Sequence, residues 1–214
     1  MATTEEMDKM YRWTRYVYDV TRKYYLLGRD RLLRDMELQP GDRVLEIGCG
    51  TARNLIRLAR QRPDIHCYGL DASNEMLATA AAHVKSRRLG ERITLKHCLA
   101  EELNYAKTFD LNAPFDAAFF SYSLSMIPTW SQAIDAALAN VKRGAAFYVV
   151  DFWDQAGWPR WFRFVLKRWL DLFHVQYRPE LLDYLRQLDK KGVGTLTIQP
   201  VAGRYACLAT FRKL

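Results

Sequence analysis

Short apolar runs alternate with longer amphipathic stretches through the middle of the chain. The apolar runs predict strands at 43–47, 66–70, 93–96, 115–120 and 145–150. A helical pattern over 51–62 is ended by Pro63, and Ser73 is suited to cap an alanine-rich helix that reaches Ser86. This alternation predicts a series of strand–helix units.

The pattern changes near the C-terminus. Two β-rich runs, 195–198 and 204–210, are joined by the turn residues 199–203, which predicts a hairpin. Strand–helix units closed by a hairpin predict an α/β fold, with a mostly parallel seven-stranded sheet, helices on both faces and a C-terminal antiparallel hairpin. Sheets of this kind bind ligands at the carboxyl ends of their strands.

Two segments, residues 1–39 and 155–190, stand outside the alternation. Both show helical spacing and are rich in arginine and aromatic residues. We expect a single domain over residues 1–214, in which 1–39 forms an N-terminal helical cap and 155–190 an amphipathic helical insertion before the hairpin.

Composition limits the class of protein. The chain has 214 residues, of which 50% are hydrophobic, and this suits one large core. The acidic, polar N-terminus and the lack of an apolar run of ~18 residues predict neither a secretory leader nor a membrane span. Four scattered cysteines without a C-x-x-C pair predict reduced thiols in the cytosol and no metal site. The formal charge of +8 favours an anionic partner.

A glycine-rich turn follows the first predicted strand, in the run VLEIGCGTARN at 44–54. A plain tight turn and a dinucleotide site are the alternatives, but a dinucleotide fingerprint needs a small residue where Arg53 stands. An acid, Glu46, also precedes the first glycine by two positions. The pattern resembles the E-x-G-x-G signature of class I S-adenosylmethionine-dependent methyltransferases.

That resemblance implies a Rossmann-like class I methyltransferase fold with S-adenosylmethionine as cofactor. Asp71 stands at the end of the second strand, where a carboxylate can accept both ribose hydroxyls. Leu99 occupies the usual position of an acid near the adenine amine, so that contact is assigned to Ala100 and Glu101. The resemblance implies cofactor contacts at Glu46, Gly48, Cys49, Gly50, Asp71, Ala72, Ser73, Met76, Ala100, Glu101 and Ser121.

The two arginine-rich segments bear on the partner. In the run RWFRFVLKRWLDLFH at 160–174, basic and apolar positions recur at helical spacing with tryptophans at the edge. A surface helix packed on the core and a membrane-surface helix both fit, and RNA is a weaker alternative because no RNA-binding module is present. We expect a cytoplasmic protein, peripheral at the inner face of an anionic membrane, and no nucleic-acid partner. The residues expected to contact substrate or membrane are Arg22, Arg29, Trp161, Arg163, Arg168, Trp169 and His174.

A closer resemblance rests on three runs: MYRWTRYVYDVTRKYYLLGRDRLLR at 10–34, VLEIGCGTARN, and FDAAFFSYSLSMIP at 115–128. Together they resemble the bacterial N-methyltransferases of betaine-lipid synthesis, which implies successive methylation of diacylglycerylhomoserine. Tyr18, Tyr25 and Tyr122 are then the expected aromatic wall for an acceptor amine. Phosphatidylethanolamine, a small amine, a quinone ring and an inactive cofactor-binding scaffold remain as alternatives. The sequence predicts no oligomeric state.

Overall fold

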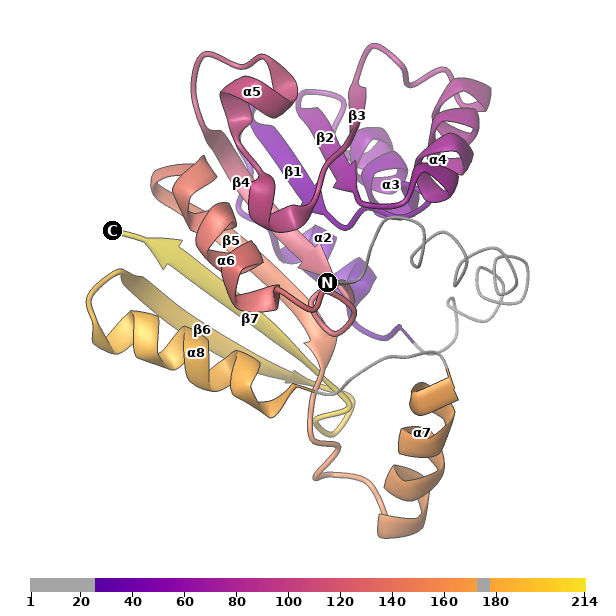
Figure 1. The fold of residues 1–214 in the computed structure, drawn as a ribbon, viewed down its shortest axis with the longest axis vertical. Coiled ribbons are helices and arrows are strands. Elements are labelled where there is room, and N and C mark those ends of the chain that lie inside the picture. Colours follow the sequence, from indigo (N-terminus) through magenta and orange to yellow (C-terminus); the bar gives the residue numbers. More distant parts are fainter. Residues whose placement is uncertain (1–25, 173–177) are drawn as a thin grey trace.

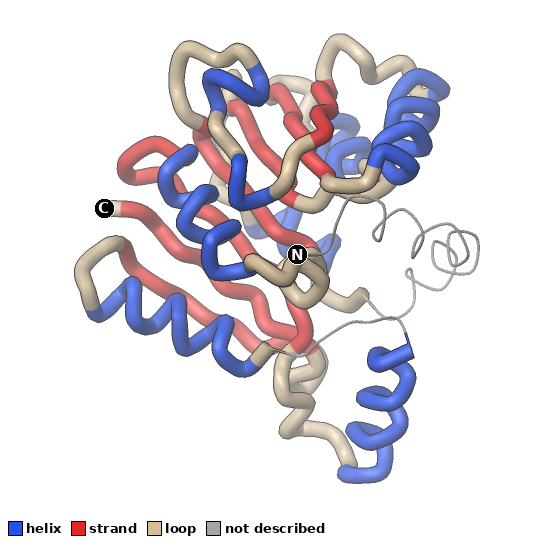
Figure 2. The backbone as a smooth tube through the Cα atoms, viewed as in Figure 1, coloured by secondary structure: helices blue, strands red, loops and turns tan. Residues whose placement is uncertain are grey.

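The computed structural model describes residues 26–172 and 178–214, and no statement is made about 1–25 and 173–177. A seven-stranded sheet in the order β3-β2-β1-β4-β5-β7-β6 forms the centre (Figures 1 and 2). The strands are β1 (Arg43–Ile47), β2 (His66–Asp71), β3 (Ile93–His97), β4 (Phe115–Ser121), β5 (Val141–Phe152), β6 (Gly194–Val201) and β7 (Ala206–Lys213).

Strand directions confirm the predicted fold class. β1 pairs in parallel with β2 and β4, and β2–β3 and β4–β5 are parallel as well. β7 runs antiparallel between β5 and β6 and forms the C-terminal hairpin. β5 begins at Val141, earlier than the predicted residue 145, because Val141 already pairs with Phe115 before a register shift in the ladder.

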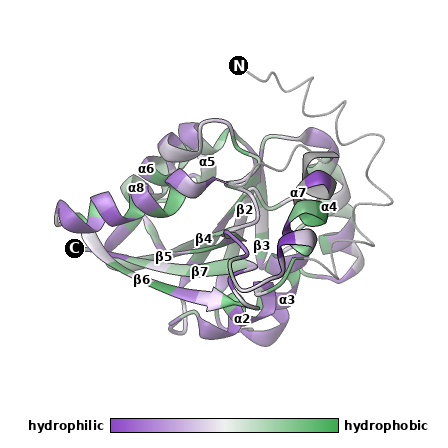
Figure 3. Ribbon diagram, turned by 90° about the horizontal axis from the view of Figure 1, so that it is seen from below, coloured by the Kyte–Doolittle hydropathy of each residue, from purple (hydrophilic) through white to green (hydrophobic). Residues whose placement is uncertain are grey.

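Helices cover both faces of the sheet, since each face is apolar (Figure 3). One face carries α2 (Arg29–Asp35), α3 (Arg53–Gln61) and α4 (Asn74–Ser86). The other carries η1 (Ala100–Glu102), α5 (Tyr105–Phe109), α6 (Trp130–Asn140) and α8 (Pro179–Lys190). The central strands are therefore buried on both sides, which explains their continuous apolar sequences.

Local sequence sets the helix starts. Ser73 caps α4 as predicted, because its Oγ accepts a hydrogen bond from the Met76 amide at 3.3 Å. α3 begins two residues later than the predicted start at 51, since Ala52 has a left-handed backbone with φ +60°. The glycine turn thus extends through Ala52 before the helix starts.

The segment predicted as one insertion, 155–190, contains two helices in different positions. α8 buries Leu181, Leu182, Leu185 and Leu188 and belongs to the helical layer on the sheet. α7 (Arg160–Leu172) instead projects from the body beyond the end of β5 (Figure 1). Of the part of the chain that the structure describes, no helix combines the length and the apolar character that crossing a membrane requires.

Candidate active site

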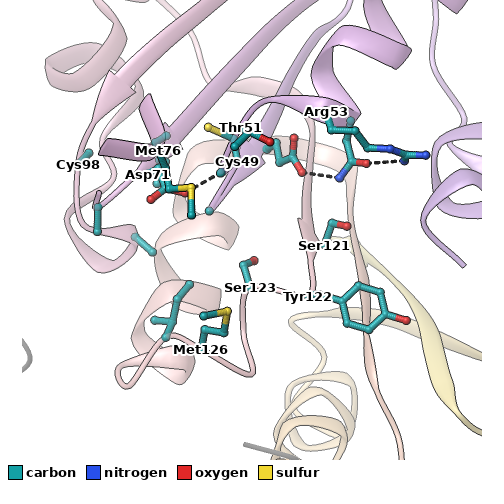
Figure 4. Close-up of a pocket in the computed structure, with 18 of the residues that line it drawn as sticks. Cys49, Thr51, Arg53, Asp71, Met76, Cys98, Ser121, Tyr122, Ser123 and Met126 are labelled. Carbon is teal, nitrogen blue, oxygen red and sulfur yellow. Dashed lines mark hydrogen bonds between the residues drawn. The ribbon is translucent and has the colours of Figure 1, made fainter. Parts of the chain in front are cut away.

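A cavity of about 1070 Å³ opens at the carboxyl ends of β1, β2 and β4. Its walls come from the turn after β1, the end of β2, the start of η1 and the loop after β4 (Figure 4). This is the edge of a parallel sheet at which ligands are expected. The cavity is large enough for a nucleoside-sized ligand together with part of a second molecule.

The glycine turn after β1 lies close to the loop after β4. The amides of Gly48 and Cys49 both donate to the Leu70 carbonyl at 2.9 Å, which ties the turn to β2. Gly48 has φ +74°, and a Cβ built there would lie 2.6 Å from the Cβ of Ser123. Both the backbone angle and this close approach require glycine.

Asp71 joins the first two turns of the site. Its Oδ2 accepts from the Gly50 amide at 2.7 Å and its Oδ1 accepts from the Ser73 amide at 2.9 Å. The residue also lines the cavity. The carboxylate is thus fixed in place at the cavity wall.

Glu46 lies under the glycine turn and is 2% exposed. Its Oε1 accepts from the Asn54 side-chain amide at 2.7 Å, while Oε2 has no hydrogen-bond partner. The pKa of Glu46 is raised to about 8, chiefly by burial and to a smaller extent by the negative charge of Asp71, while the Asn54 hydrogen bond opposes the shift. A buried carboxyl oxygen without a partner fits a site that receives a polar or cationic group.

At the far end of the cavity, Met76, Ala72, Ala100 and Glu101 line the wall as predicted. Met76 is 2% exposed and comes from the first turn of α4 (Figure 4). Ser73 does not line the cavity. Its fully buried side chain caps α4, so the structure gives it a structural position and not a lining one.

Ser121 and Tyr122 stand where β4 ends, and both line the cavity. Ser121 Oγ is buried without a partner. The Tyr122 hydroxyl donates to the Leu27 carbonyl at 2.5 Å, and Figure 4 shows it pointing away from Met76 and Asp71. Burial raises the pKa of Tyr122 well above its ordinary value, so this hydroxyl is a structural donor and is not poised to exchange a proton.

A network behind the cavity holds the loop after β4, and sequence reasoning missed most of it. Arg178, the residue before α8, donates through Nε to the Leu124 carbonyl and through Nη2 to the Ile127 carbonyl, both at 3.1 Å. Asp151, near the end of β5, accepts from the Ser125 amide at 3.0 Å. Burial raises the pKa of Asp151 to about 6, and the charge of Arg178 opposes that shift.

Arginine side chains form part of the cavity wall. Arg29 lines the cavity and donates to the Leu26 carbonyl at 3.3 Å. Arg53 and Arg57 also line it, and both pair with Asp30, at 2.8 and 3.0 Å. Within residues 26–172 and 178–214 no three His, Cys, Asp or Glu side chains gather as metal ligands would.

The remaining predicted contacts lie away from the cavity or beyond the described residues. Trp161, Arg163 and Arg168 are exposed on α7 and do not line the cavity. The residues Tyr18, Arg22, Tyr25 and His174, and the side chain of Trp169, lie outside the described part of the chain.

Comparison with known proteins agrees with this geometry. Residues 44–145 match a family described as a methyltransferase domain. The demethylmenaquinone methyltransferase of Alkalihalophilus pseudofirmus is 31% identical over 117 residues, which cover 54% of this chain and 47% of that protein. The Bacillus mycoides protein of the same name is 27% identical over 157 residues, 70% of this chain and 64% of that protein. The chain thus spans about half to two thirds of these relatives.

Solved structures share the fold. The [4+2]-cyclase SpnF superposes with a TM-score of 0.73 at 20% identity, over 99% of this chain and 97% of that one. A SAM dependent methyltransferase from Aquifex aeolicus gives 0.65 at 15% identity, over 99% and 97%. Together with the matched region, the glycine turn and the fixed carboxylate at Asp71, these likenesses lead to one conclusion. Residues 44–145 match a methyltransferase domain, and S-adenosylmethionine is the cofactor of such a site.

Proposed function

We propose that the chain is an N-methyltransferase that acts on the amine of a lipid headgroup, with diacylglycerylhomoserine as the first acceptor to test. One observation carries the choice of an amine. On the side that we assign to the acceptor, the cavity is lined by residues 121–123 and 126–129, which include no carboxylate or imidazole. An amine brings its own nucleophilic lone pair, so this side of the site needs to supply position more than proton transfer.

The cofactor fits the residues present. Asp71 presents a carboxylate, held by the Gly50 and Ser73 amides, to the cavity as an acceptor for ribose hydroxyls, and Met76 with Ala100 offers an apolar wall to a base. The partnerless Glu46 Oε2 lies on the side of the glycine turn, where a ligand ammonium group finds an acceptor. When bound, S-adenosylmethionine supplies an electrophilic methyl group on a sulfonium centre.

The chain's own residues then have three tasks. The loop after β4 must hold the acceptor nitrogen in line with the methyl group, and near-attack positioning of this kind supplies several kcal/mol. Ser121 Oγ, buried without a partner in this structure, is placed to accept a hydrogen bond from an amine N–H. Met126 and Ile127 exclude water from the same wall, and a desolvated pocket favours the neutral amine that can attack.

A quinone ring is the second candidate, because the relatives above carry demethylmenaquinone in their names. This comparison supports a quinone acceptor better than it supports an amine. Methylation of a ring carbon needs removal of a hydroxyl proton, and the tied hydroxyl of Tyr122 is unsuited to that task. Both acceptors are membrane amphiphiles, so the two candidates differ in the reacting atom and share the location.

The test is a parallel assay with methyl-labelled S-adenosylmethionine and vesicles that contain diacylglycerylhomoserine, phosphatidylethanolamine or demethylmenaquinone. We expect label in the first lipid, with products of one, two and three added methyl groups by mass spectrometry. Label in phosphatidylethanolamine alone would change the headgroup, and label in the quinone alone would establish the second candidate. Cofactor binding without transfer to any of the three would favour an inactive scaffold.

A further inference from the structure

α7 presents an apolar surface to solvent. Among the described residues, the exposed large hydrophobic side chains are Trp161, Phe164, Val165, Val193 and Leu214. Three of them lie within five consecutive residues of α7, where Trp161 is 68%, Phe164 66% and Val165 57% exposed. Clustered exposure of this kind marks an interaction surface, whereas single exposed side chains do not.

The helix is attached to the body by its other side. Residues 161, 164 and 165 follow i, i+3, i+4 spacing and share one face. On the opposite face, Leu166 is 8% exposed, and Phe162 stacks on Trp158 with ring centroids 4.5 Å apart. Among the α7 side chains that the structure describes, Leu166 and Phe162 make the contacts with the core, while Trp161, Phe164 and Val165 stay exposed.

α7 also carries arginines. Arg160, Arg163 and Arg168 are exposed, with Arg168 on this face and the other two outside it, and no ion pair joins any of them to an acid whose side chain the structure describes. Arg168 lies over the Phe164 ring, with its guanidinium carbon 6.0 Å from the ring centroid. The first turn of α7 contains no acid. Aromatic rings flanked by unpaired arginines are the composition of a helix that lies in a lipid headgroup layer.

The position of α7 relates it to the cavity. It follows the carboxyl end of β5, the sheet edge at which the cavity also opens (Figure 1). The connection is firm at its base: the Gly157 amide donates to the Gly203 carbonyl at 3.0 Å, and Trp158 Nε1 donates to the Ala202 carbonyl at 2.6 Å. α7 and the cavity thus lie beyond the same edge of the sheet.

We propose that the face formed by Trp161, Phe164, Val165 and Arg168 docks on the surface of an anionic lipid bilayer. This inference rests on the proposed function, which needs an acceptor held in a membrane. A helix of this length is roughly 20 Å long, so one face is far smaller than the ~800 Å² per partner of a stable protein interface. The rings enter the headgroup layer, and the arginines pair with lipid phosphates.

The proposal is tested by co-sedimentation with vesicles of phosphatidylcholine and phosphatidylglycerol that contain no methyl acceptor. We compare the wild-type chain, a W161S/F164S double variant, an R163Q/R168Q double variant and the matched control V193S. Val193 is also exposed, but it lies in the turn before β6. We expect at least tenfold weaker partitioning for both α7 variants, unchanged partitioning for V193S, and unchanged cofactor affinity in all.

Two results would overturn the proposal. One is vesicle binding by W161S/F164S equal to the wild type. The other is a wild-type dimer in sedimentation velocity that W161S/F164S converts to a monomer while vesicle binding stays the same, since α7 would then contact a second copy. Because these vesicles lack an acceptor, failure here leaves the labelling assay unaffected, and failure of that assay leaves this result unaffected.

Discussion

At the scale of single residues, the two acids of the site, Glu46 and Asp71, have different environments. Asp71 accepts two backbone amides, which suits the ionised form. Glu46 has one amide partner and one bare oxygen in a fully buried position, which favours the protonated form. Two carboxyls that look alike in the sequence are therefore expected to respond differently to pH and to ligand.

Replacing Asp71 with alanine should weaken S-adenosylmethionine binding by about 100-fold or more. The substitution removes the ribose acceptor and also the link between the Gly50 and Ser73 amides, and each charge-assisted hydrogen bond is worth ~1.5–3 kcal/mol. Calorimetric titration measures the effect, with Asp71→Asn as a control that keeps shape and one acceptor oxygen. Equal affinity in wild type and Asp71→Ala would place the ribose elsewhere.

Replacing Glu46 with glutamine should remove a pH dependence of stability. The pKa of Glu46 is raised from 4.5 to about 8, so between these values the folded chain holds a proton that the unfolded chain has lost. Its contribution is full below pH 4.5 and is lost as the pH rises toward 8, at about 1.4 kcal/mol per pH unit. Urea unfolding from pH 5 to 8 should show the steeper decline in the wild type, and parallel curves would contradict the assignment.

At the scale of elements, α8 supports the site although it does not line the cavity. Its leucines lie against the sheet, and the preceding Arg178 reaches two carbonyls of the loop after β4. Asp151 at the end of β5 holds an amide of the same loop from the other side. The loop after β4 is thus held in position by Asp151 and Arg178, which lie far along the chain from the glycine turn after β1.

Replacing Arg178 with glutamine should impair transfer and spare cofactor binding. The loss of both hydrogen bonds leaves two loop carbonyls short of a donor, at ~1–3 kcal/mol each, so kcat/KM for the acceptor should fall about tenfold to 100-fold. Arg178→Lys should recover little, because an ammonium cannot reproduce the two-pronged contact. A matching rise in the dissociation constant of S-adenosylmethionine would show that the whole fold, and not this loop, had been disturbed.

At the scale of the whole molecule, charge and exposed rings occur together on α7, while the cavity holds buried acids. Transfer to a vesicle-borne acceptor should therefore depend on salt. The screening length falls from ~10 Å at 0.1 M to ~3 Å at 1 M, which weakens exposed arginine–phosphate pairs. We expect several-fold slower transfer at the higher salt. Cofactor affinity, measured in the same buffers, should change much less because Asp71 is 8% exposed.

Most of the fold could be predicted from the sequence. Buried parallel strands need continuous apolar runs, and the glycine turn needs residues without a Cβ, so both leave a local pattern that can be recognised. Arg178 and Asn54 leave none, because their value lies in contacts made only after folding, with Leu124 and Glu46 respectively. Ser73 was expected both to cap α4 and to contact the cofactor; the structure confirms the cap, and the contact stays a prediction.

The contact between Gly157 and Gly203 attaches α7 to the hairpin, and neither glycine lines the cavity. A Cβ added at Gly157 would lie 2.6 Å from the Gly203 carbonyl oxygen, so the segment before α7 meets the hairpin by close backbone contact, together with the Trp158 side chain. If α7 docks on lipid as we propose, substitutions on its exposed face can adapt the protein to membranes of different composition without altering the residues of the cavity. Recruitment and chemistry are free to evolve at different rates.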